Sequence, residues 1–256
     1  MQGIRVREVE KHDFQQGNWR FHCEIRPAIT LSTTIDEWSR EWKMKLPEII
    51  FGDNNLKISL DGCKGELIIS PQYVLQHRCK ESEFDPLRIH FDSYVVNPSI
   101  AVLSDGYHWA FPSFAGAYGY DASQEKESDG SLPYDLLRSR DPIRWYQHFV
   151  LYEDDLHDFG YVLAECRVRV MKSFFFVLQQ CYLRVDRQGI YTMSHRYFGY
   201  TEGTSILHDY SFQYLDWVLV DKSSEKCLYE DVRNVNRFAS LYETRKHSFS
   251  EIGRAS

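Results

Sequence analysis

Several familiar motifs are missing from this chain of 256 residues, and each absence excludes a class of function. The six cysteines include no pair closer than 15 residues, which excludes a CxxC redox motif and a zinc knuckle. No G-x-S-x-G, G-x-x-x-x-G-K-[ST] or G-x-G-x-x-G pattern occurs, so acyl transfer, NTP binding and dinucleotide binding have no support. We therefore expect no cofactor.

Long apolar runs are also absent, and this bears on where the chain works. The densest run covers residues 174–178, far below the ~18 residues that a membrane helix needs. The first 14 residues have no apolar segment of the kind found in signal peptides. We expect free thiols and a cytoplasmic address, with the nucleus as a second one, and no membrane partner.

Basic residues are also relatively few, since 30 Lys and Arg stand against 37 Asp and Glu. The net charge of −7 argues against nucleic-acid binding through overall charge. Aromatic residues are abundant, with 17 Tyr, 16 Phe and 6 Trp available for a core or an interface. We expect one globular domain over residues 1–243 and a flexible tail over 244–256, with a second solvated, mobile segment at 122–131.

Three short helices are predicted from capping signals. Residues 34–37 (TIDE) form a capping box, and Ser70-Pro71 places a serine cap before a first-turn proline. Asp141-Pro142 repeats that signal, with Ile143, Tyr146, Phe149 and Val150 at helical spacing. The three helices should begin near residues 34, 71 and 142.

The strand signal is stronger than the helix signal. Residues 162–170 alternate in polarity, and residues 174–185 and 190–198 flank a turn at 186–189. Shorter strands are expected at 51–60, 65–69 and 87–91, and a late one at 210–220. Short connections between consecutive strands favour antiparallel pairing. The predicted class is α+β, with antiparallel β-sheets forming a two-layer core and short flanking helices.

One acidic segment suggests metal chemistry. Residues 153–158 hold four carboxylates and one imidazole, so Glu153, Asp155, His157 and Asp158 could form a metal-dependent hydrolase centre. A structural turn is the alternative, in which His157 and Asp158 hydrogen-bond the chain that enters the strand at residue 162. Ligands crowded into one run rarely converge on a metal, which favours the turn.

Two features of the strand segments suggest a surface that binds a partner. Arg167, Arg169, Arg184 and Arg196 could form a patch on one sheet face, or they could be separate solvated side chains. The run Phe174-Phe175-Phe176 is typical of a core, although alternation along a strand would let one or two of these rings line a groove.

Five segments, in order along the chain, resemble the TIPRL family (TOR signalling pathway regulator-like). His12-Asp13-Phe14 with Gly17 and Trp19 is similar to its D-F…G-x-W element. Residues 46–54 (LPEIIFGDN) are similar to L-P-E-M-x-F-G-D-N, and residues 153–160 (EDDLHDFG) to E-D-x-L-H-D-x-G. Residues 167–175 resemble its R-V-M-x-x-S-F-F strand pair, and residues 183–186 its L-R-x-D.

This resemblance implies a non-enzymatic regulator. Family members bind the catalytic subunits of type 2A-like serine/threonine protein phosphatases, in TOR-linked signalling, and a groove receives the C-terminal tail of the phosphatase. The groove positions fall on Gln72, Leu132, Thr192 and Ser194, with Arg196 nearby. Relatives have acidic residues at the positions of Gln72 and Ser194 and methionine at Thr192, so tail affinity or specificity is expected to differ here. A monomer is expected.

A physical hypothesis follows for tail capture. An extended tail would lie beside residues 190–198 and bond to their backbone by strand addition. A tail side chain would enter apolar ground near Leu132, and Arg196 would hold the terminal carboxylate by two charge-assisted hydrogen bonds. Methyl esterification of that carboxylate would then weaken capture.

Overall fold

Thirteen strands dominate the described part of the chain in a computed structural model of the protein. The structure describes residues 9–30, 33–42, 46–52, 54–63, 66–76, 125–127, 130–156, 160–186 and 189–252. The smaller sheet has the order β1-β2-β5-β6, formed by β1 (Glu10–Gln16), β2 (Trp19–Ile25), β5 (Asn55–Leu60) and β6 (Glu66–Ile69). The neighbouring strands of this sheet pair antiparallel.

The larger sheet has nine strands in the order β3-β4-β8-β9-β10-β11-β12-β13-β7. Its long centre consists of β8 (Trp145–Asp154), β9 (Gly160–Val170), β10 (Phe174–Val185), β11 (Gly189–Tyr200), β12 (Ile206–Asp216) and β13 (Glu243–Ile252). The short strands β3 (Ile29–Thr30), β4 (Ile49–Ile50) and β7 (Glu125–Glu127) lie at its two edges. Neighbouring strands pair antiparallel throughout, so the predicted α+β class with two antiparallel sheets is confirmed.

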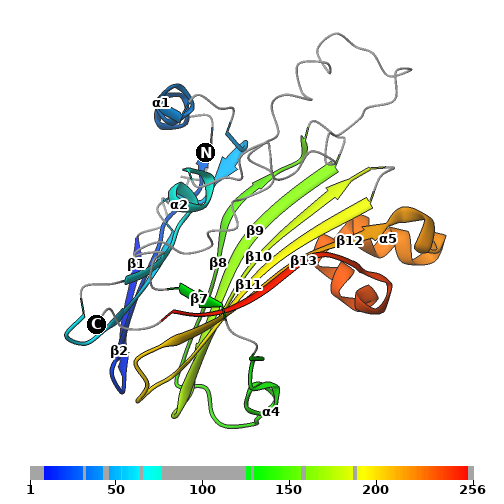
Figure 1. Cartoon of the computed structure of the whole chain (residues 1–256). Coiled ribbons are helices and arrows are strands. Elements are labelled where there is room, and N and C mark those ends of the chain that lie inside the picture. The colour runs from blue at the N-terminus through cyan, green and yellow to red at the C-terminus, as the bar shows by residue number, and fades with distance from the viewer. Residues whose placement is uncertain are drawn as a thin grey trace.

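Helical segments are short and lie around the sheets (Figure 1). They are α1 (Thr33–Trp42), α2 (Pro71–Gln76), α4 (Tyr134–Leu137), α5 (Lys222–Glu230) and the 3₁₀ segments η7 (Trp217–Leu219) and η8 (Val232–Leu241). The two predicted helices at residues 34 and 71 are confirmed, and Ser70 Oγ accepts a hydrogen bond from the Tyr73 amide at the start of α2. No helix in the described ranges is long and apolar enough to cross a membrane.

The predicted third helix is wrong. Residues 145–154 form strand β8, which pairs along its length with β9. Ile143 and Tyr146 are exposed, so the apolar positions that suggested a helical stripe do not share a buried face. A ladder of non-local hydrogen bonds to β9 outweighs a local capping signal at Asp141-Pro142.

Two segments expected to be flexible contain strands. Residues 244–252 belong to β13, which pairs with β12, so the expected flexible tail is wrong for them. Residues 125–127 form β7 on the far side of β13. Among the residues of 244–252 whose burial is described, Ser250 and Ile252 are the buried ones, so the segment shows weak alternation and its pattern suggested a tail. The expected strand at residues 87–91 lies outside the described residues.

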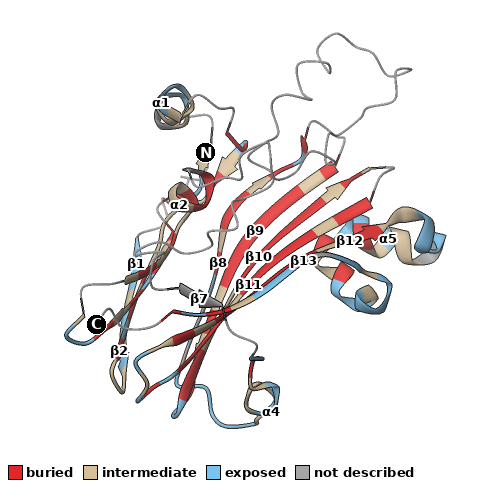
Figure 2. Cartoon of the chain, in the orientation of Figure 1, coloured by how far each residue is buried: buried red, intermediate tan, exposed pale blue. Residues whose placement is uncertain are grey.

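The main core lies between the two sheets. Trp19, Phe21 and Cys23 of β2 and Leu56, Ile58 and Leu60 of β5 pack on the inner face of the large sheet, which presents Val177, Cys181 and Leu183 of β10 and Met193 and Tyr197 of β11. Figure 2 shows the buried residues concentrated along the long central strands. The face of the large sheet turned away from the small sheet is called the outer face below.

A group of aromatic rings joins the two layers, and we call Trp19, Phe21, Trp145 and Phe175 the aromatic bridge. The Phe175 ring makes edge contacts with Trp19 and Phe21, each at a centroid distance of 5.2 Å. The Trp19 indole N–H donates to the Tyr200 carbonyl at 3.0 Å. Gly199 leaves room for Phe175, because a Cβ there would lie 2.4 Å from the ring. The bridge fixes how the small sheet sits on the large one.

We expect Phe175→Ala to lower the free energy of unfolding by about 3–5 kcal/mol, because it removes a fully buried ring and leaves a cavity between the sheets. Urea denaturation followed by tryptophan fluorescence measures the change. Tyr134→Ala, at an exposed position of α4, is the matched control and should change stability by less than about 0.5 kcal/mol. Equal effects of the two substitutions would contradict a core role for the bridge.

Candidate functional site

Two apolar clusters cover the ends of the outer face. At one end, Leu228 of α5 and Val232 and Val235 of η8 pack on Leu163, Tyr182, Ile190 and Leu215. At the other end, Leu132, with Leu136 and Leu137 of α4, packs on Met171, Phe174 and Phe198. In Figure 1, α4 and α5 lie at opposite ends of the long strands. Among the described residues, no apolar cluster covers the belt of the sheet between these two ends.

The strand register determines which residues form this belt. One row crosses β9 to β12 as Arg167, Leu178, Arg196 and Asp209, each residue paired with the next. The adjacent row is Glu165, Gln180, Ser194 and Ser211. Side chains two residues apart on a strand share a face, so both rows lie on the outer face together with Phe198 and Ile190. We call the eight residues of the two rows, without Phe198 and Ile190, the polar belt.

Glu165 is the electrostatic centre of one half of the belt. Its carboxylate is 1% exposed, and it accepts hydrogen bonds from Arg167 Nη2 at 2.6 Å and from His148 Nε2 at 2.9 Å. Arg233 of η8 lies 3.6 Å away. Burial alone would raise the pKa of Glu165, but the His148 hydrogen bond and the charges of Arg167 and Arg233 lower it overall. Glu165 thereby ties η8 to β8 and β9.

Asp209 plays the same part in the other half of the belt. It is almost fully buried, and its two oxygens lie 2.8 Å from Arg196 Nη1 and 2.7 Å from His247 Nε2. Arg196 also donates to the Ser211 hydroxyl at 3.2 Å. The guanidinium of Arg196, with 26% of its side chain exposed, is thus already neutralised by a carboxylate of the same chain.

A chain of neutral hydrogen bonds fixes the middle of the belt. Asn236 Nδ2 donates to the Tyr182 hydroxyl at 3.0 Å, and that hydroxyl donates to Gln180 Oε1 at 2.6 Å. Gln180 Nε2 in turn donates to Ser194 Oγ at 3.2 Å. Because these buried polar groups satisfy one another, Ser194 and Gln180 are held rigidly below the surface.

The predicted groove residues are only partly brought together. Thr192, Ser194 and Arg196 share the outer face of β11, and Leu132 lies in the apolar cover at one end of it. Gln72 is on α2, which packs through Val74 and Leu75 into the core on the inner side of the large sheet. Leu132, Thr192 and Ser194 are at most 3% exposed, so they support the belt from beneath.

Strand addition beside β11 is excluded. The backbone of β11 pairs with β10 along one edge and with β12 along the other, from Gly189 to Tyr200 and from Gly189 to Phe198 respectively. No backbone edge of this strand is available to a peptide. The hypothesis that a tail lies beside residues 190–198 by strand addition is therefore wrong, and any peptide on this face must be held by side chains.

Sequence reasoning missed the residues that carry most of the belt. Leu178, half-buried between Arg167 and Arg196, and the carboxylates of Glu165 and Asp209 were not singled out. A usable signal existed for Glu165, because it alternates with Arg167 and Arg169 on a strand. Two alternatives were open for Arg167, Arg169, Arg184 and Arg196, and the register places all four on the outer face.

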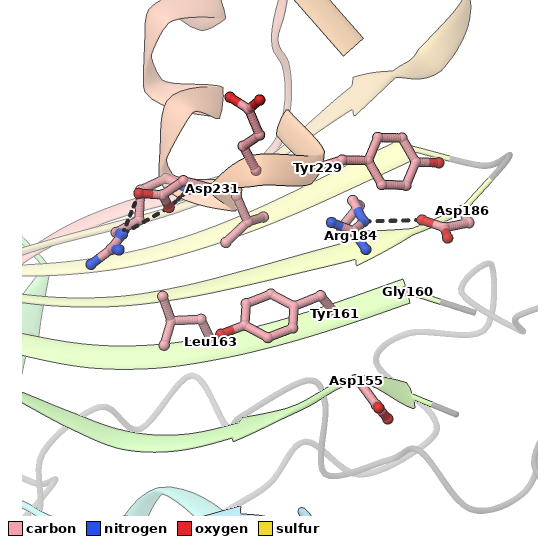
Figure 3. Close-up of a pocket in the computed structure, with 11 residues that line it drawn as sticks. Asp155, Gly160, Tyr161, Leu163, Arg184, Asp186, Tyr229 and Asp231 are labelled. Carbon is pink, nitrogen blue, oxygen red and sulfur yellow. Dashed lines mark hydrogen bonds and ion pairs between the residues drawn. The ribbon is translucent and has the colours of Figure 1, made fainter. Parts of the chain in front are cut away.

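A separate cavity of about 540 Å³ lies where α5 meets η8 (Figure 3). Arg184 pairs with Asp186 at 3.0 Å and lies 4.3 Å from the centre of the Tyr229 ring, and Arg233 pairs with Asp231 at 2.8 Å. Asp155 lies on the opposite wall. Both arginines of this cavity are thus neutralised by carboxylates that also line it.

The described residues do not form the hydrolase centre that the sequence suggested. Glu153 accepts a hydrogen bond from the Tyr161 hydroxyl at 3.0 Å, and Asp155 is exposed at the rim of the cavity. His157 and Asp158 lie outside the described residues. Among the described residues, no group of three or more His, Cys, Asp or Glu side chains is placed to hold a metal ion. Asp154 instead has a structural role, since its carboxylate accepts from the backbone amides of Glu48 and Leu156.

We expect Glu165→Gln to lower the free energy of unfolding by about 1–3 kcal/mol at pH 7, because it removes a buried charge that pairs with two guanidinium groups and accepts a hydrogen bond from the His148 ring. The pKa of Glu165 is lowered by folding, so its contribution is present above the ordinary pKa and is lost as pH falls through the lowered value. The stability difference from wild type should therefore shrink below about pH 4.5. Urea denaturation at several pH values tests this, with exposed Glu251→Gln as the control.

Comparison with known proteins gives the chain a family. The model of the TIP41-like family matches residues 49–220. A TIP41-like protein of Rattus norvegicus is 26% identical over 214 residues, covering 78% of this chain and 75% of the relative. A TIP41-like protein of Arabidopsis thaliana is 27% identical over 211 residues (72% and 71%), and one of Dictyostelium discoideum is 24% identical over 191 residues (69% of each). The family match includes the central strands that carry the polar belt, and the chain belongs to the TIP41-like family.

Proposed function

We propose that this protein is a non-enzymatic regulator that binds the catalytic subunits of type 2A-like serine/threonine protein phosphatases, as a monomer, in TOR-linked signalling. The cytoplasm is the expected place of action, with the nucleus as a second one. The resemblance of five ordered segments to the TIPRL family suggested this role, and the family match over residues 49–220 supports it.

The single observation that carries the proposal is the polar belt between two apolar covers. Its floor combines buried, mutually satisfied polar groups with the half-buried Leu178 at the centre of the arginine row. Such a surface suits a short segment of chain that offers both apolar and charged groups. We propose that the C-terminal tail of the phosphatase lies across this belt, roughly transverse to the strands.

The contacts would come from several strands at once. Leu178 of β10 would contact an apolar tail side chain, and the exposed parts of Arg167 and Arg196 would face the polar groups of the tail. Thr192, Ser194 and Leu132 would shape the surface from below, as their burial requires. Gln72 lies on a different element, α2, and we propose that it contacts the phosphatase subunit outside its tail.

Recombinant wild-type protein should retain the catalytic subunit in a pull-down and bind a peptide of its last ten residues in calorimetry. Leu178→Glu should weaken peptide binding at least about tenfold, because a charge replaces an apolar contact at the centre of the belt. Val218→Glu is the matched control, since Val218 is 89% exposed on η7, away from the belt.

Two results would contradict the proposal. Failure of wild-type protein to retain any type 2A-like catalytic subunit would contradict the proposed function. Equal loss of binding in Leu178→Glu and Val218→Glu would show that the polar belt is not the site of tail binding. Thermal unfolding of both variants shows whether each is folded before binding is compared.

A further inference from the structure

The four arginines of the outer face differ in one respect, which is whether each has an acidic partner. Arg167, Arg184 and Arg196 each have a carboxylate oxygen within 3.0 Å, from Glu165, Asp186 and Asp209 respectively. Arg169 has no carboxylate partner among the described residues. Its Nη2 donates to the Leu137 carbonyl at 2.7 Å, and its Nε is buried with no hydrogen-bond acceptor.

Within the described ranges, the positive charge of Arg169 therefore has no carboxylate beside it at a half-buried position. Arg169 is half-buried, and burial lowers its pKa, although a guanidinium stays protonated at neutral pH. A buried cation without a counter-ion is unfavourable, and an anion placed beside it recovers that free energy. The free Nε–H adds a donor, and a donor that has lost water without gaining an acceptor favours binding of one.

The surroundings of Arg169 restrict what the anion can be. Its guanidinium carbon lies 5.5 Å from the centre of the Phe176 ring, and the half-buried Leu136 and Leu137 of α4 border the same apolar cover. A ligand there needs an anionic group within a few bonds of an apolar side chain. The last residue of a polypeptide meets this need when it is apolar, because its α-carboxylate and its side chain are attached to the same carbon.

We propose that Arg169, and not Arg196, holds the α-carboxylate of the captured tail, with the last, apolar side chain packed on Phe176 and α4. This inference rests on the proposed function. It places the end of the tail at the α4 side of the polar belt, and Arg196, which Asp209 already neutralises, becomes part of the wall.

The test compares two peptides of the same ten C-terminal phosphatase residues, one ending in a free acid and one in an amide, by calorimetry on the full chain. Wild type should bind the acid at least about tenfold more tightly than the amide, the range expected for a hydrogen-bonded charged group. Arg169→Met should abolish this discrimination, so that the acid and the amide bind with equal affinity. Arg196→Met should keep the discrimination, and Arg169→Lys, which retains the charge without the planar fork, should keep part of it.

The outcomes separate this inference from the proposed function. Binding of both peptides to wild type with equal affinity, or discrimination that survives in Arg169→Met, would overturn the assignment of Arg169 and leave tail capture intact. Discrimination lost in Arg196→Met alone would move the carboxylate to Arg196. Absence of binding of either peptide to wild type would overturn the proposed function and this inference with it. Thermal unfolding of Arg169→Met and Arg196→Met shows that each variant is folded before the two peptides are compared.

Discussion

The packing of Phe175 between Trp19 and Phe21 is the contact on which the rest of the molecule depends. It closes the small sheet onto the inner face of the large one and so satisfies the main requirement for apolar burial on that side. With the inner face closed, the outer face of the same strands needs cover only at its two ends. The middle of that face can then be polar, because the strands are already held by the other side.

Polar residues on this face are stable only because they are paired. Glu165 and Asp209 are nearly fully buried, and each carboxylate contacts an arginine and a histidine ring of the large sheet. Removing the arginine from such a pair would leave a buried carboxylate without its counter-ion, which is unfavourable, so the pairing holds these side chains in place. The belt is therefore rigid, and a rigid surface loses little conformational entropy when it binds a peptide.

The sequence predicts the regular parts of this fold and misses the parts that depend on distant partners. Residues 160–200 show alternation and a turn, and they form β9, β10 and β11 as expected. Asp141-Pro142 misleads because capping is local, whereas β8 exists through its pairing with β9. Residues 244–252 mislead for a related reason, since β13 is held by its backbone ladder to β12 and, where burial is described, few of its side chains are buried.

The candidate site, too, could be predicted from the sequence only where local pattern determines it. Alternation places Arg167, Arg169, Arg184 and Arg196 on one face, but it cannot say which of them has an acidic partner. That depends on register across strands, which brings Asp209 of β12 opposite Arg196 of β11 and gives Arg169 an aromatic ring and a carbonyl instead. Local sequence contains no trace of such pairings.

The central position of β11 has a consequence for recognition that follows from topology alone. Since both of its backbone edges are used, a bound peptide receives no backbone ladder from it and must be recognised by side chains that project from several strands. Recognition of that kind depends on residue identity at each crossing point, unlike strand addition, which tolerates many sequences. If the proposed function holds, a substitution at the half-buried position 178 or 196 would change which peptide is preferred without changing the sheet that presents it.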